Sequence, residues 1–167
     1  IGFSQLNDIQ RVPGVEAAGA LGFSSGTLVF GDGRDDLNVS LIGVEAGKPG
    51  APPVLAGKEI IVDRGPQVII DMNVVRRSNV KLGDTITIKT IQGTKEEFYQ
   101  VEVIGITDER QYLFAPSIFL PYRTWDQIRP QASSGSGLVE TISNVVAVRV
   151  APGEDVNVVA DRIKSEV

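Results

Sequence analysis

Two acidic stretches hold side chains that could take part in chemistry. Asp84-Thr85 could supply one of the two carboxylates that share a proton in an aspartic protease, but Ile86 follows instead of Gly and no second such pair occurs. We expect instead a Gly-Asp turn whose carboxylate accepts hydrogen bonds from backbone N–H groups before a strand. Asp32, Asp35 and Asp36 cluster in a Gly-bearing loop, where carboxylates can hold Ca²⁺. Their spacing lacks the distant Glu of an EF-hand, so a solvated hairpin tip is favoured and calcium binding is the alternative.

Candidate nucleophiles and acid–base pairs are also incomplete. Ser24-Ser25-Gly26 and Ser133-Ser134-Gly135 carry hydroxyls, but no Lys stands in Ser-x-x-Lys spacing and the chain has no His. Without an activating base, both stretches are interpreted as linkers. One enzymatic alternative stays open, a carboxylate-dependent hydrolase that pairs Asp63 or Asp71 with Glu59, which requires two carboxylates to converge in a cleft.

The composition excludes further classes of function. The chain has neither Cys nor His, which excludes thiolate nucleophiles, disulfides, imidazole bases and Cys/His zinc sites. A formal net charge of −5 without a Lys/Arg block leaves no electrostatic footprint for nucleic acid. We therefore predict a non-enzymatic protein with no catalytic residue, cofactor or metal and no nucleic-acid partner. The absence of Cys favours an exported location.

The elements that position these residues follow from hydrophobic spacing. Apolar residues recur at helical spacing at both chain ends, over 3–12 and 155–167. Tyr122, Trp125 and Ile128 share the spacing of a buried helix face. The stretches 46–53 and 131–137 have the composition of loops. Strands are predicted over 15–21, 27–30, 37–44, 59–62, 67–71, 82–89, 98–106, 117–121 and 144–150, and short helices over 71–78 and 123–129.

This order predicts an α+β fold with two lobes. Residues 1–48 and 115–167, from both chain ends, form an α/β sandwich lobe, and residues 49–114 form a β-rich lobe inserted between them. No apolar run reaches the length of about 18 to 20 residues that spans a bilayer. Because the chain begins at Ile1 without Met and stops at Val167 inside a predicted helix, we expect a fragment of a longer protein.

A short apolar cluster has no periodic reason for its position. Tyr112, Leu113 and Phe114 lie between polar residues and the strand predicted over 117–121. Exposed apolar clusters often mark interfaces, so these three residues are a candidate interaction loop. The alternative, that they fold back onto the core, stays open.

Several of these short motifs, in this order along nearly the whole chain, resemble the large extracytoplasmic domain of MacB/FtsX-like ABC transporter permeases. Each motif alone is an ordinary turn or strand, and the ordered set carries the resemblance. The motifs are Pro13-Gly14-Val15, Leu55-Ala56-Gly57-Lys58, Val80-Lys81-Leu82-Gly83-Asp84-Thr85-Ile86, Val103-Ile104-Gly105-Ile106 and Ile118-Phe119-Leu120-Pro121.

The resemblance implies a porter-like lobe with an inserted Sabre-like lobe, located between two transmembrane helices on the extracytoplasmic face of a bacterial cell membrane. The domain would transmit conformational change and contact substrate or partner proteins, while a separate cytoplasmic ATPase hydrolyses ATP. Its partners would be the flanking transmembrane helices, the ATPase indirectly, and an adaptor protein or a second permease copy. The alternative, from another class, is a stand-alone extracytoplasmic binding module that holds a small molecule or peptide in the cleft between the lobes.

Overall fold

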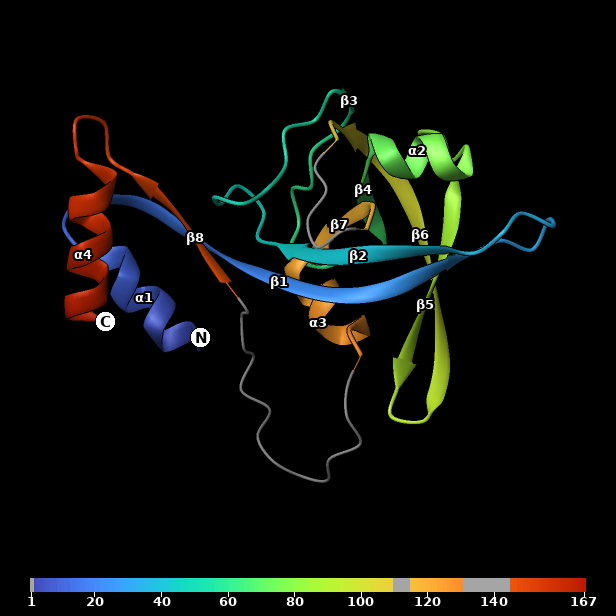
Figure 1. Cartoon of the computed structure of the whole chain (residues 1–167), viewed down its shortest axis with the longest axis horizontal. Coiled ribbons are helices and arrows are strands. Elements are labelled where there is room, and N and C mark those ends of the chain that lie inside the picture. The colour runs from blue at the N-terminus through green and yellow to red at the C-terminus, as the bar shows by residue number, and fades with distance from the viewer. Residues whose placement is uncertain (1, 110–114, 131–144) are drawn as a thin grey trace.

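The computed structural model describes residues 2–109, 115–130 and 145–167, and its strands form one eight-stranded mixed sheet accompanied by helices (Figure 1). In chain order the elements are α1 (Phe3–Arg11), β1 (Val15–Val29), β2 (Leu37–Val44), β3 (Ala56–Gly57), β4 (Gln67–Asp71), α2 (Met72–Ser78), β5 (Thr85–Gln92), β6 (Lys95–Thr107), β7 (Ser117–Pro121), α3 (Tyr122–Ile128), β8 (Val145–Val150) and α4 (Val156–Glu166). The predicted α+β class is confirmed.

Six of the strands close into a barrel. The pairings run from β1 to β2, β7, β4, β6, β5 and back to β1. The β2–β7 and β4–β6 pairs are parallel and the other pairs are antiparallel. Alternate side chains of these strands, such as Leu28, Leu41 and Ile88, point into the barrel and form its buried core.

Helix α3 covers one end of the barrel and inserts Trp125 into it. The indole lies against Gly22 and Gly43, where a Cβ atom would come within 2.2 Å and 2.7 Å of Trp125 atoms, so only glycine fits at both positions. The indole Nε1 donates a hydrogen bond to Ser24 Oγ at 2.9 Å. Tyr122, Trp125 and Ile128 are buried, which confirms the predicted buried helix face.

Strand β1 is longer than the barrel needs. Its second part pairs with β2, whereas residues 15–21 leave the barrel and pair with β8. The two terminal helices, α1 and α4, lie beside this pair at one end of the molecule (Figure 1). We call residues 15–21 of β1, together with β8, α1 and α4, the stem.

Residues 51–62, which we call the strap, cross the outer face of the barrel. Ile60 of the strap packs with Ile42, Ile69 and Phe119 in a second, smaller core, while the adjacent Ile61 is 80% exposed. The strand predicted over 59–62 is therefore wrong, because these residues pair with no strand.

Two other predictions are wrong in the opposite direction. Residues 22–26 were expected to separate two strands, and Ser24-Ser25-Gly26 was expected to be a linker, but all lie within β1 because β2 pairs with them residue by residue.

The division into lobes of residues 1–48 with 115–167 and residues 49–114 stays a prediction. Strands from both parts pair in the same sheet, through β1 with β5 and β4 with β7.

Candidate functional site

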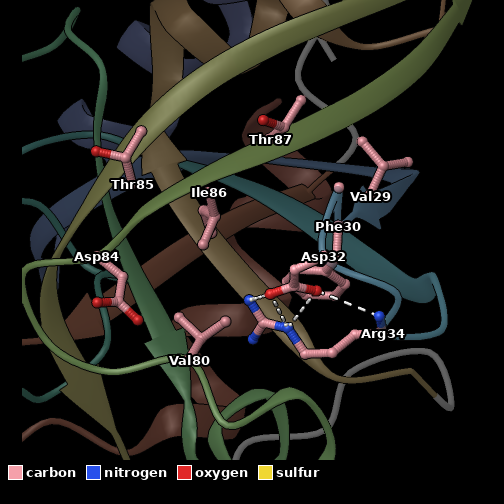
Figure 2. Close-up of a pocket in the computed structure, with 10 residues that line it drawn as sticks. Val29, Phe30, Asp32, Arg34, Val80, Asp84, Thr85, Ile86 and Thr87 are labelled. Atoms are coloured by element: carbon pink, nitrogen blue, oxygen red, sulfur yellow. Dashed lines mark hydrogen bonds and ion pairs between the residues drawn. The ribbon is translucent and has the colours of Figure 1, made fainter.

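The acidic turn between β1 and β2 borders a surface hollow of about 410 Å³ (Figure 2). The hollow lies between this turn and the beginning of β5. Apolar walls come from Phe30, Val80 and Ile86, and the charged groups are Asp32, Arg34 and Asp84. A ligand site in this hollow would require charged groups that are not already paired within the protein.

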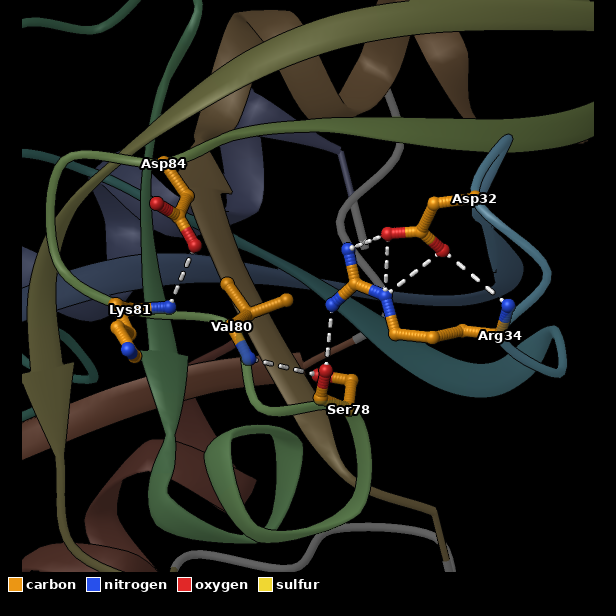
Figure 3. A network of polar contacts seen from close by, with 6 residues as sticks. All are labelled: Asp32, Arg34, Ser78, Val80, Lys81 and Asp84. Carbon is orange, nitrogen blue, oxygen red and sulfur yellow. Dashed lines mark hydrogen bonds and ion pairs between the residues drawn. The ribbon is translucent and has the colours of Figure 1, made fainter.

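Arg34 is fully engaged by the protein itself (Figure 3). Its Nε and Nη2 bond Asp32 at 2.7–3.0 Å, and its Nη1 donates to the Ser78 carbonyl at 2.6 Å. The guanidinium also lies 4.2 Å from the centre of the Phe30 ring. The Arg34 hydrogen bond lowers the pKa of the Asp32 carboxyl, and the pKa of Arg34 is raised in turn. These contacts fasten the β1–β2 turn to the end of α2.

The other acidic residues of this region also have structural roles or face solvent. Asp84 Oδ2 accepts a hydrogen bond from the Lys81 N–H at 2.8 Å just before β5, which confirms the expected Gly-Asp turn. Asp35 and Asp36 are exposed. Within the part of the chain that the structure describes, no group of three or more acidic residues could hold a metal ion. The calcium alternative for residues 32–36 therefore gains no support.

The carboxylates of the hydrolase alternative do not form an acid–base pair in a cleft. Asp71 is fully buried, and its two oxygens accept hydrogen bonds from the Val74 and Ser117 N–H groups, both at 2.9 Å. Burial raises the pKa of Asp71. Glu59 and Asp63 are exposed, and Asp63 accepts a hydrogen bond from the Ala46 N–H. Asp71 therefore caps α2 and anchors the start of β7.

The stem brings the two chain ends together. Val15 pairs with Val150, and the Ala151 N–H donates to the Gly14 carbonyl at 2.9 Å. Helix α4 packs on this junction through Val159, which is fully buried. Arg162 of α4 donates to the Pro13 carbonyl at 3.0 Å. The N- and C-termini consequently lie at the same end of the molecule (Figure 1).

A family model described as the MacB-like periplasmic core domain matches residues 2–166. The chain belongs to this family. It is therefore an extracytoplasmic domain of an ABC transporter permease of the MacB/FtsX-like type, as the sequence motifs indicated. No curated protein sequence is significantly similar to the chain.

Solved structures with the MacB-like fold agree with this assignment. The extracellular domain of the ABC-type transporter YknZ from Gram-positive bacteria matches with a TM-score of 0.64 and 19% identity, over 99% of this chain and 78% of that chain. The periplasmic region of MacB from Actinobacillus actinomycetemcomitans gives 0.66 and 16%, over 99% and 72%. A domain of a permease protein from Porphyromonas gingivalis gives 0.57 and 16%, over 96% and 69%. At these identities the similarity shows a shared fold.

Two expectations for this MacB-like domain concern the membrane and the interaction loop. Among the described residues, no helix has both the length and the apolar character needed to cross a membrane. The candidate interaction loop of Tyr112, Leu113 and Phe114 lies outside the described residues, as does the predicted linker over 131–137. The role of this loop stays a prediction.

Sequence reasoning missed an exposed apolar surface on this MacB-like domain. Leu55 and Ile61 of the strap are 65% and 80% exposed, and Leu82 is 45% exposed. Leu82 lies close to Gly57, where an added Cβ would come within 2.7 Å of its Cδ1 atom, so Leu82 sits beside the strap. The strand prediction for 59–62 assumed that all its apolar residues are buried. Ile60 and Ile61 are adjacent and cannot both face inward in a strand, and this was the signal in the sequence that one of them is exposed.

A second hollow, of about 690 Å³, lies between residues of both predicted lobes. Its lining combines a mostly apolar surface with several hydroxyl groups, the Asn38 amide and one cation, Lys89. Thr27 and Asn38 form a hydrogen bond of 3.3 Å across the β1–β2 pair in this lining. The lining residues are Ser24, Ser25, Gly26, Thr27, Asn38, Val39, Ser40, Lys89, Thr90, Ile91, Ala115 and Pro130.

Proposed function

We propose that this domain transmits motion between the membrane-embedded helices of its permease and partners outside the membrane, without catalysing a reaction itself. The observation that carries the proposal is the stem, in which the segments that lead to both chain ends are attached to one strand pair. A displacement of the helices that continue from these ends would act on the same structure. Because β1 runs without interruption from the stem into the barrel, the barrel would follow.

The partners follow from this arrangement. The flanking transmembrane helices would move the stem, driven indirectly by a cytoplasmic ATPase that hydrolyses ATP. The strap and the Tyr112-Leu113-Phe114 loop are the surfaces we propose for contact with substrate, an adaptor protein or a second permease copy. Leu55 and Ile61 support the strap as one of these surfaces, because large exposed apolar side chains are enriched where proteins meet.

The full-length permease provides the test. A flexible Gly-Ser-Gly-Ser insertion directly after Val167 should abolish transport coupled to ATP hydrolysis, because it leaves the domain folded but breaks its rigid connection to the next helix. The matched control places the same insertion in the exposed β5–β6 turn at Gly93-Thr94, which should leave transport intact. Unchanged transport after the Val167 insertion would contradict the proposal.

A binding module is the second candidate function, and the hollow of about 690 Å³ favours it. Its hydroxyl and amide groups could hydrogen-bond a polar small molecule or a peptide backbone. Titration of the isotope-labelled domain with short peptides and small saccharides, followed by NMR, tests this function. Saturable chemical-shift changes that are confined to residues of the hollow and lost in Asn38→Ala would support a binding module. The absence of such changes would leave the transmission of motion as the only proposed function.

A further inference from the structure

We propose that residues 45–50 form a clasp that fixes the angle between stem and barrel, with Glu45 as the positioning residue. This inference rests on the proposed transmission of motion and names the part of the domain that makes the transmission rigid. Without the clasp, the stem would meet the barrel only as a narrow strand pair and a helix contact. Two-stranded ribbons are marginally stable on their own and bend and twist readily.

The first argument is the hydrogen bonding where β1 leaves the barrel. Strand β2 ends at Val44, which pairs with Leu21, so no further β2 residue pairs with β1. The next group on that edge, the Ala20 N–H, donates to the Glu45 carboxylate at 2.7 Å. The Glu45 side chain thus takes the place of a strand partner at the point where the ribbon would otherwise begin to bend.

The second argument is packing against the strand backbone. A Cβ atom on Gly19 would lie 2.5 Å from the Pro49 carbonyl oxygen and 2.8 Å from Lys48 Cβ. One on Gly50 would lie 2.6 Å from Leu21 Cδ2. Pro49 is buried, so the clasp packs directly on the backbone of Gly19 and on the side chain of Leu21.

Helix α1 makes a second connection between stem and barrel. Within the stem, the Gln10 side chain holds α1 on β1 by donating to the Ala18 carbonyl at 3.2 Å, on the same edge of β1 as the Ala20 N–H. The Phe3 ring meets the Tyr122 ring of α3 edge to face, with 5.8 Å between their centres. With the clasp and α1 both in place, stem and barrel move as one body.

A pair of spin labels measures this rigidity. Because the chain has no Cys, Lys164→Cys in α4 and Glu97→Cys in β6 give one defined pair of labelling sites, both exposed. Double electron–electron resonance should show a single narrow distance distribution for this pair of spin labels. Gly19→Ala, which forces the clasp off β1, should broaden or shift the distribution. Gly31→Ala is the matched control, since its added Cβ meets nothing within 4 Å.

Glu45 variants test the positioning residue independently of packing. Glu45→Ala should broaden the same distribution and speed hydrogen exchange of the Ala20 amide by about tenfold, because its acceptor is lost. Glu45→Gln keeps an acceptor oxygen and should restore both readouts. An unchanged distribution in both Gly19→Ala and Glu45→Ala would overturn the clasp. That result would leave the Val167 insertion test unaffected, so the two proposals fail separately.

Discussion

At the scale of single residues, the contact between Trp125 and two glycines holds the end of the barrel closed. Gly22→Ala should lower the free energy of unfolding by about 1–3 kcal/mol, because its Cβ would lie 2.2 Å from the buried indole ring. Urea unfolding followed by Trp125 fluorescence measures the loss. Gly31→Ala serves as the control and should change stability by less than about 1 kcal/mol. Equal stabilities of the two variants would contradict the tight contact.

Asp71 is a second residue whose role depends on burial. Asp71→Ala removes both acceptors that hold α2 and β7 together, and it should cost about 2–4 kcal/mol of unfolding free energy. Urea unfolding monitored by circular dichroism gives this value. The matched control is Asp84→Ala, which removes an exposed turn contact and should cost less. A loss no larger than that of the control would show that Asp71 is not an anchor.

The pH dependence of the same variant follows from burial. Burial raises the pKa of Asp71 above its usual 3.8, so the folded protein holds this proton more tightly than the unfolded chain does. The stabilisation from protonating Asp71 is therefore fully present below 3.8 and is lost as the pH rises through the folded-state pKa. The stability gap between the parent protein and Asp71→Ala should widen as the pH falls from about 7 to about 4, as urea unfolding at each pH will show. A gap that narrows would contradict the raised pKa.

At the scale of helices and strands, α4 depends on Asp155, the residue that caps its N-terminus. The Asp155 carboxylate accepts hydrogen bonds from the N–H groups of Asn157 and Val158 at 2.8 Å and 3.3 Å. Asp155→Ala should lower the free energy of unfolding by about 1 kcal/mol. It should also speed amide hydrogen exchange in α4 more than in the other elements. Asp161→Ala, which removes only an exposed contact to Lys164, is the control and should leave exchange unchanged. Uniform exchange across the domain in both variants would contradict this role.

Local patterns predicted most elements but not the interruptions between them. The helical spacing of Leu6 and Ile9 and the alternation of Ile86 and Ile88 each reflect one buried face, so α1 and β5 were predictable. The prediction for residues 22–26 was wrong because glycine and serine carry no hydrophobic periodicity, and only pairing with β2 makes these residues a strand. The strand prediction over 59–62 was wrong because only Ile60 packs, on the outer face of the barrel, while Ile61 faces solvent.

The candidate sites were predictable to a smaller degree, because they depend on residues far apart in the chain. The turn at Asp84 forms from neighbouring residues and was predicted. The bond between Arg34 and the Ser78 carbonyl and the one between Glu45 and Ala20 join distant segments. No pattern within either segment identifies its partner. The contacts that fasten the β1–β2 turn to α2, and the clasp, could therefore be found only in the folded structure.

At the scale of the whole molecule, the adjacent chain ends give a direct test of the stem. Attaching one helix of an antiparallel coiled coil before residue 1 and its partner helix after residue 167 should preserve the fold and raise Tm. The pairing of the two helices restricts the unfolded chain, and it does not strain the folded one because both ends lie at the same end of the molecule. Calorimetry measures Tm, and the control carries both helices after Val167, joined to each other by a short loop. If joining both ends lowers Tm below this control, the ends do not lie side by side in solution. A pair of membrane helices could then no longer act on one strand pair, and the proposed transmission of motion would lose its structural basis.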